Sequence, residues 1–302
     1  FRDIFEHLVI APFTEAYQIG QTPNPCVTCN RTIKFDALAQ AALANGSEYF
    51  ATGHYARITQ NPQGEYHLQV AAHRAKDQSY FLYGMPATLL KQTLFPLGDF
   101  PNKEAVRAQA ARFALPVAQK RDSQEICFIP DDDYAGFLER RCPSLQQPGT
   151  IIYRDGTILG HHQGTYRFTI GQRKGLGIAW REPLYVLKVD PLRHEVTVGE
   201  RAYLDCSGLE ATDCHWLAPL PENGAVQAKV RYRHQALTAQ ASLSENGRHL
   251  SLCFTTPVSG IAPGQSVVLY DQDTVLGGGI ITEGRATPPV STEENHHPLQ
   301  RT

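Results

Sequence analysis

Residues 31–55 read RTIKFDALAQAALANGSEYFATGHY, and this stretch decides the fold class. Apolar residues recur at helical spacing in its first half, at Phe35, Leu38 and Ala42. With Gly46 as a suitable C-cap, the pattern predicts a helix over residues 31–44. Residues 48–52 are typical of a short buried strand that ends at Gly53. A helix followed by a strand with a glycine at its carboxyl end is an α/β pattern, and open α/β sheets bind ligands at that edge.

Upstream of this unit, residues 21–30 read QTPNPCVTCN. Two prolines separated by one residue do not fit inside a helix, so we expect a rigid loop that leads into the helix. Cys26 and Cys29 form a C-x-x-C on this loop. A helix start lowers the pKa of a nearby thiol and so favours a nucleophile or a metal ligand, and Arg31 and Lys34 add positive charge. A structural zinc site is disfavoured because the chain has no second C-x-x-C.

Downstream, the α/β pattern continues. Residues 55–59 and 66–72 are typical of a hairpin, and Lys76 starts a segment that we expect to be helical. Asn102 is placed to N-cap a further helix. The α/β part ends near Leu138.

The sequence pattern changes from α/β to mostly β after residue 143. Residues 151–159 and 184–198 each predict a hairpin. From residue 209 onward, about six short strand patterns separated by turn residues predict a small barrel or sandwich. The stretch from Arg285, rich in Pro, Thr, Glu and His, predicts a disordered tail.

The composition excludes several classes of protein. The 302 residues carry 28 basic and 30 acidic side chains, which excludes a uniformly basic nucleic-acid binder. No apolar run is long enough for a membrane span, so we expect no membrane association. Seven cysteines, an odd number, disfavour a secreted disulfide framework and favour a reducing cytoplasm.

Although the net charge is close to zero, the basic side chains are unevenly distributed along the chain. Residues 165–181 and 227–234 contain several basic side chains and no acidic one. If 227–234 were a strand, Lys229, Arg231 and Arg233 would share one face. Two such acid-free patches indicate a polyanionic partner. Cys127 lies in a polar stretch, whereas a structural cysteine is usually found in an apolar run, so we expect Cys127 to be reactive.

Six stretches, in this order, together resemble one family, the tRNA-specific 2-thiouridylases of the MnmA type. They are TPNPCVTCN at 22–30, ATGHYAR at 51–57, KDQSYFL at 76–82, DSQEICFI at 122–129, FTIGQRKGLG at 168–177 and RYR at 231–233.

The resemblance implies three domains and a tail. Residues 1–138 would be an α/β catalytic domain of the adenine-nucleotide α-hydrolase type, incomplete because the pyrophosphate loop is lacking. Residues 139–204 would be a small central α+β domain that contacts tRNA, 205–284 a C-terminal β-barrel, and 285–302 a disordered tail.

The resemblance also implies a sulfurtransferase. Such an enzyme uses ATP with Mg²⁺ to adenylate C2 of the wobble uridine in the tRNAs for Lys, Glu and Gln. It then installs sulfur that a persulfide relay has carried from a cysteine desulfurase in the cytoplasm. Cys127 would carry the persulfide. Cys29 would attack it, releasing sulfide or forming a Cys29–Cys127 disulfide, and Gly53 would lie at the nucleotide.

The tRNA contacts follow from the same resemblance. Residues around the target base would be Asn24, Pro25 and Cys26. Further residues that would touch tRNA are Lys76, Asp77, Gln78, Arg231 and Tyr232.

The sequence departs from the family at two places. Many members have Asp where this chain has Cys26, and the third thiol allows a [4Fe-4S] cluster held by Cys26, Cys29 and Cys127. The family's Ser-Gly-Gly-x-Asp-Ser loop, which activates ATP, has no counterpart in residues 1–302. We therefore expect the chain as given to be an inactive fragment. Two alternatives stay open: a non-catalytic tRNA-binding remnant, and a sulfur or iron–sulfur carrier, which would leave the basic patches unexplained.

Overall fold

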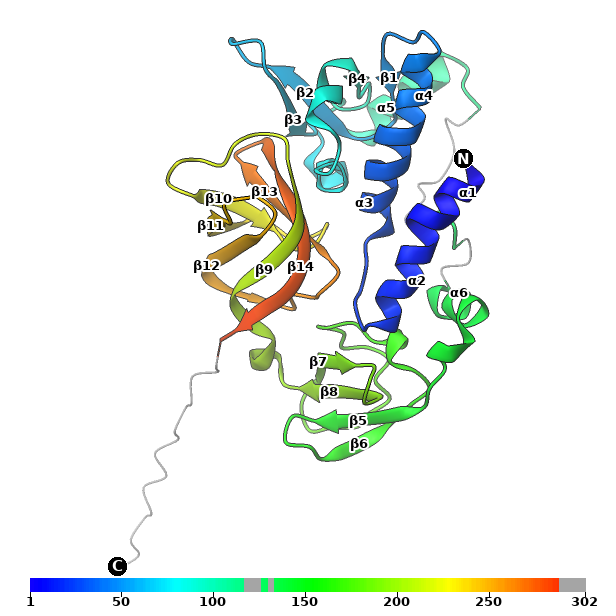
Figure 1. Ribbon diagram of the computed structural model, residues 1–302, viewed down its shortest axis with the longest axis vertical. Coiled ribbons are helices and arrows are strands. Elements are labelled where there is room, and N and C mark those ends of the chain that lie inside the picture. Colours follow the sequence, from blue (N-terminus) through cyan, green and yellow to red (C-terminus); the bar gives the residue numbers. More distant parts are fainter. Residues whose placement is uncertain (117–125, 130–132, 288–302) are drawn as a thin grey trace, which may run out of the picture.

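The computed structural model describes residues 1–116, 126–129 and 133–287, which form three units (Figure 1). An N-terminal helical and α/β unit adjoins a six-stranded barrel, and a smaller four-stranded unit lies at the far end of helix α2. Within the described ranges, no helix is both long enough and apolar enough to cross a membrane.

Two long helical runs lie side by side along the N-terminal unit. The first comprises α1 (Arg2–Phe5), a π-helical stretch (Glu6–Ile10) and α2 (Ala11–Gln18). Pro12 lies in the first turn of α2, directly after the π-helical turns. A proline ring clashes with the preceding turn of a regular α-helix, and the wider π turns leave room for it.

The second run comprises α3 (Pro25–Cys29), a π-helical stretch (Asn30–Leu38) and α4 (Ala39–Ala44). The predicted start at residue 31 was wrong, because Pro25 occupies the first helical position, where its missing N–H costs nothing. The rigid loop is therefore shorter than expected, and both cysteines of the C-x-x-C lie on the helix itself.

A short parallel sheet ends this unit. Strand β1 (Phe50–Ala51) lies within the predicted strand and pairs with β4 (Thr93–Leu94). Ala51 is exposed, so the expected full burial of this strand was wrong. Helix α5 (Lys103–Arg112) is confirmed, and Asn102 accepts a hydrogen bond from the backbone N–H of Ala105 at 2.8 Å.

The predicted hairpin is confirmed as β2 (Ala56–Gln60) and β3 (Tyr66–Val70). Its outer strand β3 pairs with the barrel strand β14 at Gln69 and Thr274, so hairpin and barrel form one eight-stranded sheet. The helix expected from Lys76 was wrong. The chain instead makes two short 3₁₀ turns, Arg74–Lys76 and Ser79–Phe81, and a third follows at Ala87–Gln92.

The middle unit begins with helix α6 (Tyr134–Arg141) and confirms both predicted hairpins. The strands are β5 (Gly149–Tyr153), β6 (Ile158–His162), β7 (Tyr185–Asp190) and β8 (Glu195–Gly199). They form one sheet in the order β6-β5-β8-β7, in which β5 and β8 run parallel. The other turns of this part are 3₁₀ segments at Pro143–Leu145, Thr165–Arg167 and Arg201–Leu204.

The C-terminal unit is a closed barrel, as expected. Its strands are β9 (Asp205–Trp216), β10 (Ala225–Lys229), β11 (Leu237–Leu243), β12 (Leu250–Ser259), β13 (Ser266–Asp271) and β14 (Thr274–Ala286). Strand β13 pairs with both β10 and β14, which closes the ring. Strand β14 includes Arg285, where we expected the tail to start, and the rest of that tail lies outside the described residues from 288 onward.

One hydrophobic core spans two units. Leu68, Tyr80 and Leu82 of the N-terminal unit cluster with Val268 and Tyr270 of the barrel, and all five are almost fully buried. At about 25 cal/mol per Å² of apolar surface, such shared burial contributes to the stability of both units at once. The barrel thus fixes the loop that carries residues 76–82.

Candidate active site

The C-x-x-C lies on the first turns of α3. Cys26 and Cys29 are three positions apart, so their side chains emerge on the same side of the helix. Cys26 is exposed, Cys29 is half-buried, and both thiols are free. Asn24 precedes the helix in an extended conformation and makes no side-chain capping hydrogen bond.

Cys127 belongs to a β-turn over residues 126–129, closed by a 2.9 Å hydrogen bond from the backbone N–H of Ile129 to the carbonyl of Ile126. The neighbouring Phe128 packs edge-on against Phe13 of α2, at 5.4 Å between ring centroids. Apolar neighbours therefore hold the turn while the thiol of Cys127 is exposed and free. The preceding motif residues, Asp122–Glu125, lie outside the described residues.

The three thiols share one electrostatic neighbourhood. Although Cys26 is exposed on one side, the protein atoms packed around its thiol displace water and raise its pKa; the neighbouring Cys127 raises it further, while the ammonium of Lys34 lowers it. Burial also raises the pKa of Cys29. The ammonium of Lys34 lowers this pKa, and Cys127 raises it. The expectation of lowered thiol pKa values was wrong, because loss of solvent outweighs the nearby positive charge.

The sequence predicted that Arg31, like Lys34, would place positive charge near the thiols, but its side chain contacts the barrel instead. Its guanidinium pairs with the carboxylate of Asp213 on β9 at 2.6 Å and lies 2.6 Å from the ring nitrogen Nε2 of His215. Arg31 therefore joins the helix to the barrel and does not act on the thiols.

Gly53 follows β1 at the carboxyl end of the parallel sheet, the edge at which we expected a ligand. The next residue, His54, lies 3.4 Å from the ammonium of Lys34 through Nε2 and 2.8 Å from Oγ1 of Thr52 through Nδ1. Burial and then the charge of Lys34 lower the pKa of His54 to about 4. The imidazole is therefore neutral, and Nε2 accepts the hydrogen bond from Lys34.

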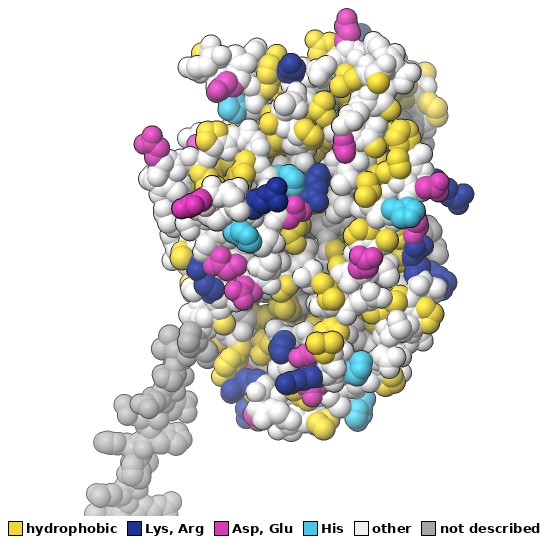
Figure 2. All heavy atoms as spheres, in the orientation of Figure 1, with side chains coloured by type: hydrophobic (Ala, Val, Ile, Leu, Met, Phe, Trp, Pro, Cys, Tyr) yellow, Lys and Arg dark blue, Asp and Glu magenta, His cyan; other side chains and the backbone are white. Residues whose placement is uncertain are grey.

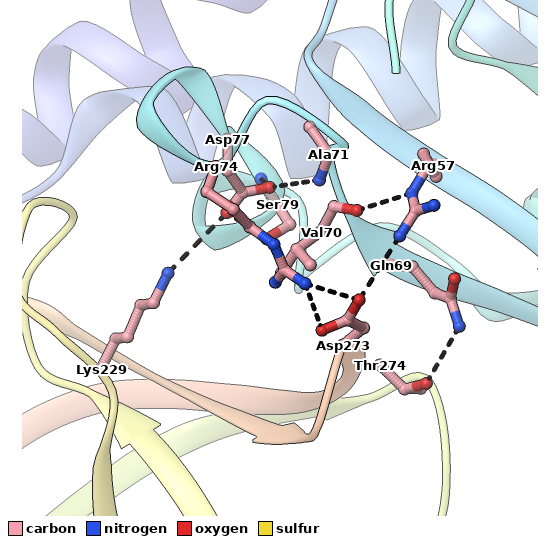
Figure 3. A network of polar contacts seen from close by, with 10 residues as sticks. All are labelled: Arg57, Gln69, Val70, Ala71, Arg74, Asp77, Ser79, Lys229, Asp273 and Thr274. Atoms are coloured by element: carbon pink, nitrogen blue, oxygen red, sulfur yellow. Dashed lines mark hydrogen bonds and ion pairs between the residues drawn. The ribbon is translucent and has the colours of Figure 1, made fainter. Parts of the chain in front are cut away.

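Asp77 organises the segment of residues 76–82 (Figure 3). Its carboxylate accepts hydrogen bonds from the backbone N–H of Ala71 at 2.9 Å and from the N–H and hydroxyl of Ser79 at 3.2 and 2.8 Å. The ammonium of Lys229 in the barrel lies 3.8 Å away. These local bonds compete with helix formation, which explains the 3₁₀ turns. Asp77 is 6% exposed, so its contacts lie within the protein.

The residues on either side of Asp77 are less buried than Asp77 itself. The side-chain oxygen of Gln78 accepts a hydrogen bond from the backbone N–H of Tyr55 at 2.9 Å. Lys76 is half-buried at the end of the first 3₁₀ turn. Contact of these residues with tRNA stays a prediction.

The sequence suggested a strand over residues 227–234, which would include Arg231. Strand β10 instead ends at Lys229, and Arg231 lies in the turn that follows. Its guanidinium donates to the carbonyl oxygens of Ile170 and Gly260. A Cβ added to Gly171 or Gly260 would lie 3.2 or 3.1 Å from the guanidinium nitrogen Nη2. The two glycines thus leave the space that Arg231 fills between the middle unit and the barrel.

Tyr232 turns toward the N-terminal unit. Its ring lies 4.4 Å from that of Phe81, centroid to centroid. The RYR and KDQSYFL motifs, far apart in sequence, therefore meet in space.

Sequence reasoning missed one residue that fixes this region. Asp273, in the turn between β13 and β14, pairs with Arg74 at 2.6 Å and Arg57 at 3.5 Å, so both ends of the hairpin segment are tied to the barrel (Figure 3). A single Asp in a hairpin turn is ordinarily read as a turn residue, and the sequence offers no stronger signal. On the face drawn in Figure 2, basic and acidic side chains are interspersed, as the near-neutral composition predicts.

Three family models match the chain. They are the tRNA methyl transferase HUP domain over residues 1–131, the tRNA methyl transferase PRC-barrel domain over 135–200 and the aminomethyltransferase beta-barrel domain over 206–281.

Several curated relatives match almost the whole chain. A protein of Pelobacter propionicus is 49% identical over 92% of this chain and 78% of its own length. One from Trichlorobacter lovleyi is 48% identical over 92% and 78%, and one from Geotalea uraniireducens is 48% identical over 97% and 78%. Each of the three is named tRNA-specific 2-thiouridylase MnmA.

Proposed function

The chain belongs to the tRNA-specific 2-thiouridylase family, and from this premise we propose that it replaces the C2 oxygen of the wobble uridine in tRNA with sulfur. The expectations of an inactive fragment, of a non-catalytic tRNA-binding remnant and of a sulfur or iron–sulfur carrier find no support in these relatives, and we do not propose them here. The substrates are the tRNAs for Lys, Glu and Gln, and ATP activates the oxygen. The sulfur arrives as a persulfide passed on from a cysteine desulfurase, and the reaction takes place in the cytoplasm. Gly53, at the ligand-binding edge of the sheet, faces the nucleotide.

The observation that carries this proposal is the shared neighbourhood of Cys26, Cys29 and Cys127. These thiols come from a helix and from a turn distant in sequence, yet Cys127 lies near enough to both Cys26 and Cys29 to raise their pKa values. A thiol that receives sulfur must be accessible to a donor, and Cys127 is exposed. A second thiol must lie close enough to attack, a role that fits Cys29.

The transfer balances with these two cysteines. The Cys29 thiolate attacks the inner sulfur of the Cys127 persulfide, so that a Cys29–Cys127 disulfide forms and hydrosulfide leaves. The hydrosulfide attacks C2 of the adenylated uridine, AMP leaves with the former oxygen, and loss of a proton gives the thiocarbonyl. A dithiol reductant then returns both cysteines to thiols.

The target base fits the loop before α3. Asn24 leaves its amide free of capping, and Pro25 and Cys26 begin the helix beside it. A rigid segment with a free amide suits an unstacked base from a single-stranded loop, which is read by its hydrogen-bonding edges. We place Lys76, Gln78 and Tyr232 at the tRNA as well.

The second route, an iron–sulfur cluster on the three thiols, is not favoured. No group of three His, Cys, Asp or Glu side chains among the described residues is arranged to hold a metal ion. The present arrangement of Cys26, Cys29 and Cys127 therefore does not fit a cluster, and we derive no step through one.

Single cysteine variants test the proposal. Cys29→Ala and Cys127→Ala should abolish 2-thiouridine in tRNA, measured by nucleoside mass spectrometry in cells that carry no other copy, whereas Cys253→Ala, an exposed thiol in the barrel, should not. Incubation with a persulfide donor should add one sulfur atom to the peptide containing Cys127. Retained thiolation in the Cys127→Ala variant would refute the route, and iron bound to purified protein would favour the cluster.

A further inference from the structure

The loop that joins the two halves of the middle sheet borders two hollows. One, of about 580 Å³, is lined by Arg173 and residues 175–184 of the loop, and the other, also about 580 Å³, is lined by loop residues together with Tyr153 and Asp155. Both hollows share Ala179, Trp180 and Arg181, so Trp180 borders each of them. This volume is within the range of sites that hold small organic molecules.

Trp180 is supported from one side. Its ring lies 5.2 Å from that of Tyr153, at an interplanar angle of 35°. Tyr153 is only 6% exposed, and its hydroxyl donates a hydrogen bond to Glu200, so the support does not move. Trp180 itself remains 38% exposed, so part of its ring is open to solvent. An indole held on one side and open elsewhere is suited to stacking.

Three cations belong to the same loop as this indole, and two of them, Arg173 and Arg181, line the first hollow together with it. Arg173, Lys174 and Arg181 are exposed, and among the described residues none of their three side chains forms a hydrogen bond or an ion pair, although the backbone carbonyl of Lys174 accepts one from the side-chain amide of Gln172. Two other basic residues of the middle unit are engaged: Arg167 pairs with Glu139 and Arg154 with Glu200.

The acidic lining of the hollows is limited. Glu182 and Asp155 both border them, and a carboxylate oxygen of Asp155 accepts from the backbone N–H of Thr157 at 2.9 Å. The three free cations thus exceed the two carboxylates, and the local balance favours an anion.

Glycines open the backbone between the cations. Gly175 and Gly177 have φ values of +80° and +67°, a left-handed region that favours glycine. A Cβ at Gly177 would meet no atom within 4 Å, so the space beside the backbone there is open. A phosphate can therefore approach the main chain here.

The loop is also connected to the thiol site. Thr169, four residues before Arg173, receives a 3.2 Å hydrogen bond from the hydroxyl of Thr22, and Thr22 lies on the loop that leads to Asn24 and Cys26. The loop that leads to the target-base residues therefore contacts the segment that leads into the basic loop. A tRNA bound at the thiols has further nucleotides to place along this path.

We propose that Trp180 and the basic loop of residues 173–181 bind a second, unpaired nucleotide of the tRNA. The base stacks on the indole, and its backbone phosphates meet Arg173, Lys174 and Arg181. Aromatic stacking combined with a basic surface is how proteins hold single-stranded RNA, whereas paired bases are not free to stack in this way. The inference rests on the proposed function, since the nucleotide belongs to the same substrate.

Fluorescence gives a direct test, because the chain has two tryptophans, Trp180 and Trp216. Trp216 lies in the barrel, where its indole N–H donates to the carbonyl of Gly247 at 2.9 Å. In a Trp216→Phe variant, tRNA should quench Trp180, and a fully paired RNA duplex with the same number of phosphates should not. Equal quenching by the duplex, or none by tRNA, would overturn the stacking site.

Affinity gives the second test. Trp180→Ala should weaken tRNA binding by about 5- to 150-fold, the range that one stacked base supplies. Trp180→Phe should retain part of the affinity, and Trp216→Phe should leave it unchanged. Unaltered affinity in Trp180→Ala would refute the stacking site. The proposed function would still stand in that case, provided that the unsubstituted protein binds and thiolates tRNA. Loss of both in the unsubstituted protein would refute the proposed function itself.

Discussion

The guanidinium of Arg231 donates a 2.9 Å hydrogen bond to the carbonyl oxygen of Ile170, and so joins the turn after β10 to the middle unit. The same nitrogen also donates to Gly260 in the barrel. Tyr80 of the N-terminal unit lies near enough to Arg231 for each group to influence the pKa of the other. One side chain thus lies where all three units meet.

This placement predicts the behaviour of Arg231→Ala. We expect unfolding to cost about 2 kcal/mol less, because hydrogen bonds from a charged donor are lost and two carbonyls are left unpaired. The sequence-based prediction that Arg231 touches tRNA is untested, and because its guanidinium is occupied by two carbonyls we expect an indirect effect: tRNA binding should weaken through displacement of the middle unit, with an unchanged dependence on salt. Thermal unfolding and binding isotherms at several salt concentrations check this, with the exposed Arg248→Ala as control. A salt slope shallower by about one would instead indicate direct contact with a phosphate.

Sulfur transfer should be faster at alkaline pH. Burial raises the pKa of Cys29, so its thiolate is scarce at neutral pH, and Lys34 opposes this. Lys34→Gln removes the opposing charge, so the pKa should rise and the pH profile should move to higher pH. Alkylation of the Cys29 peptide, followed by mass spectrometry across pH, measures this shift. The exposed Lys91→Gln should leave the profile unchanged, and an unmoved profile in Lys34→Gln would contradict the role of Lys34.

His54 predicts a loss of stability in mild acid. Its folded pKa, about 4, lies below the ordinary 6.5, so between these values the unfolded chain binds a proton that the folded protein does not. Stability therefore falls as the pH drops from about 6.5 to about 4, by on the order of 1–2 kcal/mol after allowance for solvent screening. Urea unfolding at pH 7 and pH 5 should show this, and the difference should be smaller in His54→Gln. An equal difference in both proteins would assign it to other groups.

Two carboxylates of the same network should differ in importance. Asp77→Asn should destabilise the protein by about 3 kcal/mol, because a buried carboxylate with three hydrogen bonds and a nearby Lys229 loses its charge. Asp273→Asn should cost about 0.5–1 kcal/mol, since its pairs with Arg74 and Arg57 are open to solvent. Chemical denaturation measures both, and a larger loss for Asp273→Asn would contradict this ranking.

Features set by neighbouring residues were predictable from the sequence. The cap at Asn102 and the hairpin turn at Asp155 and Gly156 depend on side chains within a few positions. Strands β10 and β11 were predictable because buried and exposed residues alternate along them. Strand β13 is buried at five consecutive positions, so its apolar run and the flanking turn residues marked it instead. Strand β4 was not, since two residues carry no periodicity.

Features set by distant partners were not predictable. The segment after Lys76 has helical spacing, but Asp77 binds the backbone of Ala71 and prevents the helix. The candidate thiols could be named from the motifs that carry the family resemblance. Their raised pKa values depend on burial by parts of the chain that local sequence does not reveal. The prediction of a strand at Arg231 was wrong because its partners, Ile170 and Gly260, come from segments that are distant in sequence.

The pairing of Gln69 with Thr274 has a consequence for the order in which the protein is made. These residues are separated by 205 positions, so a ribosome finishes β3 long before it synthesises β14. Until then, the edge of the hairpin presents unpaired backbone groups to other nascent chains. Completion of the fold must also wait for a contact of large sequence separation, which slows folding. Chaperone demand should therefore peak late in translation and fall once β14 has emerged from the exit tunnel.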